Sequence, residues 1–274
     1  MLDYVSGYDG STVQLDAGSL HVGTAEDLRG REWSYTLGHR GISGAVRSSR
    51  EASVELASID PAQLDRARHI FDRDVQTGAG GELVYAGEWR TAALVVSSAP
   101  STIFGRFAVA KLGIVLADGV WRRSHEMHVP MPSAVAGDGG LDYPHDYPYA
   151  YARPEPPKSV KASEWGESAV GLRIYGPATN PAVTIGGTTY QIMREVADTE
   201  RIEVDGLHRT VELVTLYGER INVAADAVRG RGAGGGNYIF QPLPPGEAPV
   251  ASDGSFAFDV IWYDEEGEPP WSLS

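Results

Sequence analysis

Cysteine is absent from all 274 residues of this chain. Its absence excludes disulfide scaffolds, thiol nucleophiles, zinc ribbons and iron–sulfur clusters. Basic residues are also scarce, since 23 Lys and Arg stand against 37 Asp and Glu and leave a formal net charge of −14. Proteins that bind nucleic acid through its phosphates need clustered Lys and Arg side chains to neutralise them. We therefore expect no specific nucleic-acid binding, and the same charge disfavours an anionic membrane surface.

Long apolar runs are missing too. Runs such as Leu112–Ala117 are far shorter than the ~20 residues that span a bilayer. The start, Met1-Leu2-Asp3-Tyr4, lacks the basic and apolar regions of a signal peptide. We expect a soluble protein made in the cytoplasm, without membrane insertion. The 42% hydrophobic content is enough for a sizeable core and excludes wholesale disorder.

Turn-forming residues are abundant, with 33 Gly and 17 Pro at short intervals. Short alternating or β-branched runs between turns are typical of β-sandwiches and barrels, so the predicted fold class is mainly β. The expected strands are 31–37, 52–58, 82–85, 91–97, 107–116, 120–128, 170–175, 182–185, 188–196, 201–204, 210–216 and 256–263. Gly186-Gly187 and Asp205-Gly206 are expected to form two-residue hairpin turns, because such pairs accept the positive φ that these turns need.

One segment has a helical pattern instead. Asp60 before Pro61 is a typical N-cap with proline at the first helical position. Apolar residues then recur at three-to-four spacing, and Gly78 is suited to a C-terminal cap. We predict one amphipathic helix near 61–77, packed on a sheet. The N-terminal half is therefore predicted to be α+β and dominated by β.

Proline, glycine and tyrosine are concentrated between residues 130 and 158. A residue that precedes proline is pushed toward extended geometry, which makes such a stretch semi-rigid. We therefore predict an N-terminal domain over 1–140, a linker over 141–158 and a C-terminal β-sandwich over 159–274.

Motifs that would carry chemistry are weak. Gly230-x-Gly232-x-x-Gly235 leads into a proline-rich segment rather than a helix, so a loop is favoured over a nucleotide site. His125 and His128 on one strand would point to opposite faces and would not share a metal. The acidic run 264–268 lacks calcium-loop spacing and is interpreted as a solvated turn. We expect no catalytic, cofactor-binding or metal-binding residue, and so no enzyme.

Aromatic residues are the most distinctive local feature. The cluster consists of Tyr143, Tyr147, Tyr149 and Tyr151, with Trp165 nearby. Rigid tyrosines could stack on sugar rings or form an interface hot spot. They could also pin a proline-rich linker between two domains, and this structural role is favoured because prolines fix the backbone there.

Five motifs stand in order along the chain. They are Arg31-Glu32-Trp33-Ser34-Tyr35, Leu141-Asp142-Tyr143-Pro144-His145-Asp146-Tyr147-Pro148-Tyr149, Ile174-Tyr175-Gly176-Pro177-Ala178-Thr179-Asn180-Pro181, Ile185-Gly186-Gly187-Thr188-Thr189-Tyr190 and Trp262-Tyr263-Asp264-Glu265-Glu266-Gly267-Glu268-Pro269-Pro270-Trp271. This ordered set resembles the siphophage distal tail proteins (Dit). The resemblance covers nearly the whole chain, and Tyr-Gly-Pro-x-x-Asn-Pro is its sharpest motif.

The resemblance implies a β-rich N-terminal domain with one helix that assembles into a hexameric ring at the tip of a long non-contractile tail. It implies a C-terminal galectin-like β-sandwich and a location in the virion. The implied partners are other copies of the chain, the major tail tube protein, the tail-associated hub or fibre protein, and the tape-measure and receptor-binding proteins. Candidate interface or linker-packing residues are Trp33, Tyr35, Tyr143, Tyr147, Tyr149 and Tyr151. Candidate fold or glycan-contact aromatics of the C-terminal domain are Trp165, Tyr175, Tyr190, Trp262 and Trp271.

Two other functions stay open at this stage. The first is a carbohydrate-binding module or adhesin that recognises host cell-wall glycan through an aromatic platform on the C-terminal sandwich. The second is a glycan hydrolase, which needs a pair of carboxylates in a cleft. If six copies of a chain with charge −14 form a ring, we expect a net acidic or neutral channel, because like charge lets DNA slide without sticking.

Overall fold

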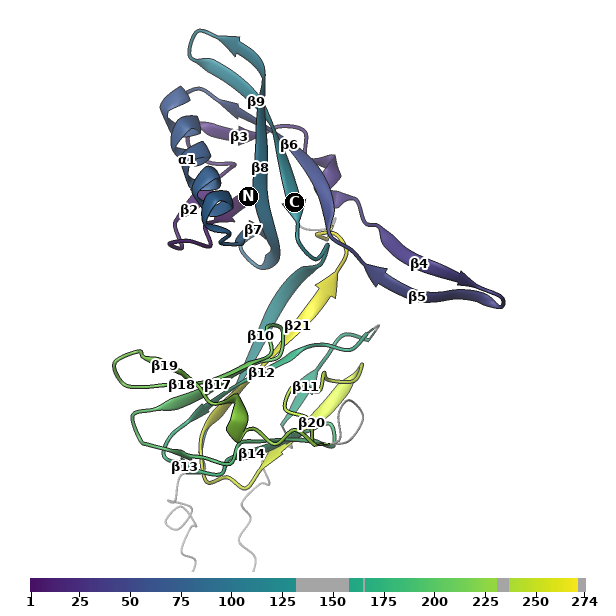
Figure 1. Cartoon of the computed structure of the whole chain (residues 1–274), viewed down its shortest axis with the longest axis vertical. Helices are drawn as coiled ribbons and strands as arrows, with labels where there is room; N and C mark the ends of the chain where they lie inside the picture. The colour runs from purple at the N-terminus through teal and green to yellow at the C-terminus, as the bar shows by residue number, and fades with distance from the viewer. Residues whose placement is uncertain (132–157, 165, 231–236, 271–274) are drawn as a thin grey trace, which may run out of the picture. The chain divides into compact units, whose positions relative to one another are not determined.

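The computed structural model (Figure 1) describes residues 1–131, 158–164, 166–230 and 237–270. It divides into two compact units, one formed by 1–124 and 265–274 and the other by 125–264. The predicted boundaries 1–140, 141–158 and 159–274 remain a prediction, because most of the linker lies outside the described residues. Within the described residues no helix is long and apolar enough to cross a membrane.

The first unit is built on an antiparallel sheet in the order β2–β1–β7–β8–β9–β6–β3. Its strands are β1 (Leu2–Val5), β2 (Thr12–Gln14), β3 (Leu20–Val22), β6 (Arg50–Ser58), β7 (Gly81–Tyr85), β8 (Trp89–Phe104) and β9 (Phe107–Leu116), with the start of β10 (Trp121–Val129) paired to β8. A short 3-10 helix, η1 (Glu26–Arg29), precedes a separate hairpin of β4 (Trp33–Gly38) and β5 (Gly41–Arg47). Burial alternates along β6 and β9, as expected for strands that cover a core with one face.

The predicted helix is confirmed with its bounds. Helix α1 spans Pro61–Thr77, and the carboxylate of Asp60 accepts a hydrogen bond from the Ala62 N–H at 3.1 Å. Gly78 caps the other end in the left-handed conformation. The helix lies against the sheet beside β8 (Figure 1). Leu64, Ala67 and Phe71 of its apolar stripe are buried, whereas Val75 is exposed, and Phe71 meets the ring of Tyr4 edge-on at 5.0 Å.

The second unit encloses one core between two antiparallel sheets. One sheet has the order β19–β18–β17–β12–β21–β10 and the other β11–β20–β14–β15. The strands are β11 (Ser159–Lys161), β12 (Val170–Tyr175), β14 (Ala182–Ile185), β15 (Thr188–Gln191), β17 (Arg201–Asp205), β18 (Thr210–Val214), β19 (Arg220–Asn222), β20 (Glu247–Ser252) and β21 (Phe258–Glu266), with a small pair β13 (Ala178–Thr179) and β16 (Glu195–Val196) and a 3-10 helix η2 (Ala224–Asp226). Both sheets contribute to the buried cluster, as Leu172, Ile185, Tyr190 and Phe258 show.

One of the two predicted hairpin turns is correct. Gly186 and Gly187 both have positive φ and join β14 to β15, which pair through Ile185 and Thr188. The second turn is wrong in length, because four residues rather than two separate β17 from β18. The Asp205 carboxylate accepts hydrogen bonds from the amides of Leu207 and His208, which favours a longer turn over the tight one.

Gly176, in the Tyr-Gly-Pro motif, is required by close backbone packing. A Cβ at this position would lie 1.8 Å from the carbonyl oxygen of Ala197. The Gly176 N–H donates to the carbonyl of Glu200 at 3.0 Å, and this hydrogen bond holds the backbone of Gly176 close to residues 197–200. The glycine therefore has a packing role within the second unit.

We expect Gly176→Ala to lower the free energy of unfolding by about 1–3 kcal/mol, because the backbone must shift to admit the methyl group. Urea unfolding followed by tryptophan fluorescence measures this cost. The control is Gly166→Ala, where an added Cβ meets no atom within 4 Å. Equal midpoints for the two variants would contradict the assignment.

Candidate assembly surface

The hairpin β4–β5 exposes an apolar surface on the first unit. It forms a two-stranded sheet of its own and projects from the unit (Figure 1). Every residue of β4 is exposed, and Leu37 at 74% and Ile42 at 66% exposure pair directly across the two strands. An isolated two-stranded hairpin is marginally stable in water, and exposed apolar patches commonly mark interaction sites. The exposed hairpin is therefore a candidate contact surface.

The base of this hairpin is held in place by its own side chains. The guanidinium of Arg47 lies 4.8 Å from the ring centre of Trp33, its cross-strand partner. The hydroxyls of Ser34 and Ser48 are 2.8 Å apart. Trp33 and Tyr35 were expected to serve as interface or linker-packing residues, and the structure places both on the exposed β4. Whether they contact a partner stays a prediction.

The hairpin of β8 and β9 has a second exposed apolar tip. Ile103 and Phe104 are 74% and 82% exposed, and Phe107 is also exposed. Unlike β4–β5, these two strands continue into the main sheet, where β9 pairs with β6. None of the sequence motifs described above includes Ile103 or Phe104. An apolar pair beside Gly105 within a long strand pattern is the signal that would have found it.

A charged network lies around Asp259 in the second unit. Its carboxylate, only 3% exposed, receives hydrogen bonds from the Tyr175 hydroxyl at 2.6 Å and the Arg173 guanidinium at 3.0 Å, and lies 2.6 Å from Nδ1 of His128. Burial by itself raises the pKa of Asp259, but the hydrogen bonds from Tyr175, His128 and Arg173 outweigh it and hold the pKa below its usual value. Burial and the bond to Asp259 raise the pKa of Tyr175. The group is a salt-bridge network that ties β10, β12 and β21 together.

Of the other predicted aromatic residues, one is buried, one is half-buried and six lie outside the described residues. Tyr190 is buried, and its hydroxyl donates to the carbonyl of Gln241 at 2.6 Å. The Trp262 indole donates to the carbonyl of Lys161 at 3.0 Å and stacks on His125. Tyr143, Tyr147, Tyr149, Tyr151, Trp165 and Trp271 lie outside the described residues. Gly232 and Gly235 of the glycine-rich motif lie outside them as well.

The histidine pair and the acidic run have separate structural roles. His125 and His128 both lie on β10, as expected, but His125 contacts Asp264 at 2.8 Å while His128 contacts Asp259. The interpretation of 264–268 as a solvated turn is wrong, because β21 continues to Glu266 and Glu265 pairs with Arg122 at 2.9 Å. Among the residues that the structure describes, no group of three His, Cys, Asp or Glu side chains is arranged to hold a metal ion.

Comparison with known proteins finds solved structures of similar fold but no match in sequence. No protein-family model matches the sequence, and no curated protein matches it. The fold matches the crystal structure of the SPP1 Dit (gp 19.1) protein, described as a paradigm of the hub adsorption apparatus in phages that infect Gram-positive bacteria. That match has a TM-score of 0.55 at 10% identity and covers 97% of this chain and 99% of the other.

Two further matches are chains of the phage P2 baseplate in its activated conformation, one with calcium and one with strontium. Each has a TM-score of 0.61 at 10% identity and covers 98% of this chain and 100% of the other. Identity of 10% supports a statement about fold alone. The chain therefore has, over nearly its full length, the β-rich single-helix fold of the Dit and baseplate proteins that its sequence motifs resemble.

Proposed function

We propose that this chain is a structural, non-enzymatic component of a phage tail tip, located in the virion. Six copies would form a ring that joins the tail tube to the hub and receptor-binding apparatus and lets DNA pass. The full-length likeness to Dit and baseplate chains supports the role. The resemblance of the ordered sequence motifs supports it independently.

The exposed β4–β5 hairpin is the observation that carries the ring proposal. A projecting apolar arm that must be covered by a different surface of an identical copy makes a heterologous contact. Heterologous contacts generate a ring when the rotation between copies closes, and an open filament when it does not. The first unit, which holds the arm, is therefore the ring-forming part, in line with what the resemblance implies for the N-terminal domain.

The second unit is proposed to project from the ring as a galectin-like sandwich. Its two sheets around one core support a sandwich. The proposed partners are the major tail tube protein and the tail-associated hub or fibre protein, with the tape-measure and receptor-binding proteins as further contacts. Assembly would take place in the cytoplasm of the host.

Electron microscopy and light scattering of the purified chain test the ring. We expect six-fold rings with a central hole for the wild type. The double variant Leu37→Glu/Ile42→Glu should be monomeric at tens of micromolar, because charges on the hairpin face would be buried without partners in the contact. A strictly monomeric wild type would reject the proposed function.

The matched control is Tyr217→Glu in the second unit. Tyr217 is 94% exposed, so its replacement adds charge at an exposed aromatic residue of the other compact unit. This variant should form rings like the wild type. Rings from the hairpin double variant would show that β4–β5 is not the assembly arm.

A further inference from the structure

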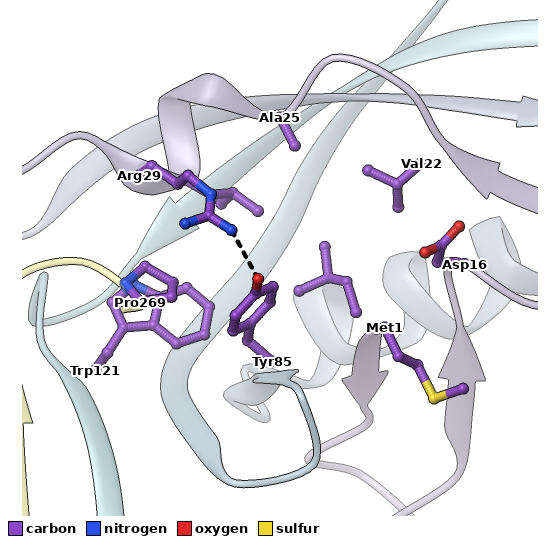
Figure 2. Close-up of a pocket in the computed structure, with 10 residues that line it drawn as sticks. Met1, Asp16, Val22, Ala25, Arg29, Tyr85, Trp121 and Pro269 are labelled. Carbon is purple, nitrogen blue, oxygen red and sulfur yellow. Dashed lines mark hydrogen bonds between the residues drawn. The ribbon is translucent and has the colours of Figure 1, made fainter. Parts of the chain in front are cut away.

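A surface pocket opens on the first unit. Its volume is about 140 Å³, and its walls include Leu2, Val22, Leu28, Tyr85 and Trp121. Figure 2 shows Val22 and Met1 on one side of the space and Tyr85 with Trp121 on the other. An apolar cavity of about this size holds one benzene ring. The pocket therefore fits a single aliphatic or aromatic side chain.

The charges around the pocket are not evenly placed. Arg29 lies on the Tyr85 side, where its guanidinium donates to the Tyr85 hydroxyl at 2.7 Å and lies 5.3 Å from the ring centre (Figure 2). Asp16 lies near Met1 and is exposed. Burial raises the pKa of Asp3, the positive N-terminal amino group lowers it, and the nearby carboxylate of Asp16 raises it. Asp16 is thus an exposed carboxylate in the pocket wall with which a cation on an occupant could pair.

The tip of the β4–β5 hairpin has the complementary features. Leu37 and Ile42 form an exposed aliphatic pair on one face, and Arg40 lies in the turn between them. An aliphatic pair beside a cation matches an apolar pocket beside a carboxylate. Both surfaces belong to the same chain, so a contact between them in two copies would be heterologous.

We propose that the pocket receives one side chain of the Leu37–Ile42 pair at the hairpin tip of a neighbouring copy, with Arg40 of that copy paired to Asp16. This inference rests on the proposed ring and names the surface that the arm meets. The β8–β9 tip also combines apolar residues with a cation, Arg106. The β4–β5 hairpin is chosen because it has no third strand on either edge within the described chain.

A charge exchange between the two positions tests the pairing. Asp16→Arg and Arg40→Asp should each weaken assembly about tenfold or more, because like charges would then face each other. The double variant Asp16→Arg/Arg40→Asp should recover most of the loss, since it restores opposite charges. Sedimentation velocity over a dilution series measures the concentration at which rings dissociate. Thermal unfolding of each variant checks that the first unit stays folded.

Two controls separate this inference from the ring itself. Asp65→Arg changes an exposed carboxylate on α1 and should leave assembly unchanged. Phe104→Glu places a charge on the other hairpin tip and should also leave rings intact. Loss of rings in Phe104→Glu but not in Leu37→Glu/Ile42→Glu would assign the contact to β8–β9 and overturn the proposal.

The outcomes distinguish the two proposals. If the wild type forms rings and both single charge variants assemble equally well, the proposed pocket contact is wrong and the proposed ring stands. Single variants that weaken assembly without recovery in the double variant overturn the Arg40–Asp16 pairing. A wild type that never forms rings rejects the proposed function, and the pocket inference falls with it.

Discussion

Replacing Asp74 with alanine is expected to lower the free energy of unfolding of the first unit by about 3–5 kcal/mol. Asp74 is completely buried on α1. Its carboxylate accepts hydrogen bonds from the hydroxyls of Tyr4 and Ser6 at 2.8 and 2.7 Å, and from the amides of Gly7 and Tyr8 at 3.3 Å. Alanine would remove the acceptor of the Tyr4 and Ser6 hydroxyls and of the Gly7 amide, whereas the Tyr8 amide also donates to the Ser6 hydroxyl at 3.3 Å.

The same carboxylate joins the helix to β1, the strand next to the edge strand β2. Tyr4 lies on β1 and also packs against Phe71, so its position depends on both contacts. Burial raises the pKa of Tyr4, and its hydrogen bond to Asp74 raises it further, which keeps the hydroxyl a donor. Tyr4→Phe removes one of the four donors and keeps the ring. It should therefore cost only about 1 kcal/mol.

Urea unfolding followed by fluorescence compares these variants. The control is Asp72→Ala, which removes an exposed carboxylate two residues away on the same helix. Such a surface change is expected to stay within about 0.5 kcal/mol of the wild type. If Asp74→Ala unfolds at the midpoint of Asp72→Ala, the buried carboxylate does not hold α1 to the sheet.

Acid is expected to destabilise the second unit through Asp259. The pKa of this carboxyl is lower in the folded chain than its ordinary value near 4, because Tyr175, His128 and Arg173 bond to the charged form. A lowered folded pKa gives stability that is complete above the unfolded pKa and is lost as the pH falls through the folded one. We therefore expect the unfolding free energy to fall below about pH 4.

Asp259→Asn should remove this fall in stability at acid pH, and it should lower the free energy of unfolding by about 2–4 kcal/mol near neutral pH. The neutral amide no longer attracts the Arg173 guanidinium. It also offers the Tyr175 hydroxyl a weaker acceptor. Unfolding midpoints measured from pH 7 to pH 3 give both quantities.

The exposed Asp198 provides the matched control in the same unit, and Asp198→Asn should keep the pH profile of the wild type. Equal slopes of stability against pH in Asp259→Asn and the wild type would show that other carboxylates cause the acid sensitivity.

Features specified by neighbouring residues were predicted from the sequence. The bounds of α1 follow from Asp60, Pro61 and Gly78, each of which acts within a few residues of the helix end. The turn at Gly186-Gly187 is equally local. The Asp205-Gly206 prediction failed because the Asp205 side chain bonds to later backbone amides, which a dipeptide pattern does not show.

The candidate assembly surface was predicted only in part. Trp33 and Tyr35 were selected, but as members of a motif set rather than as one strand of a projecting hairpin. The pairing of Leu37 with Ile42 depends on the register between two strands. The exposure of this hairpin could not be predicted from its alternating polar and apolar residues. The same alternation is typical of a strand that buries one face in a core.

The sequence by itself determined the mainly β class, the single helix with its caps and the absence of cysteine chemistry, because these depend on composition and on contacts a few residues apart. The tertiary structure decided which residues work together over long separations. It brought Asp74 to the hydroxyl of Tyr4, turned the acidic run into a paired strand end, and returned residues 265–270 to the unit that begins the chain. Strand pairing and burial join residues that no local pattern links, so only the folded chain reveals them.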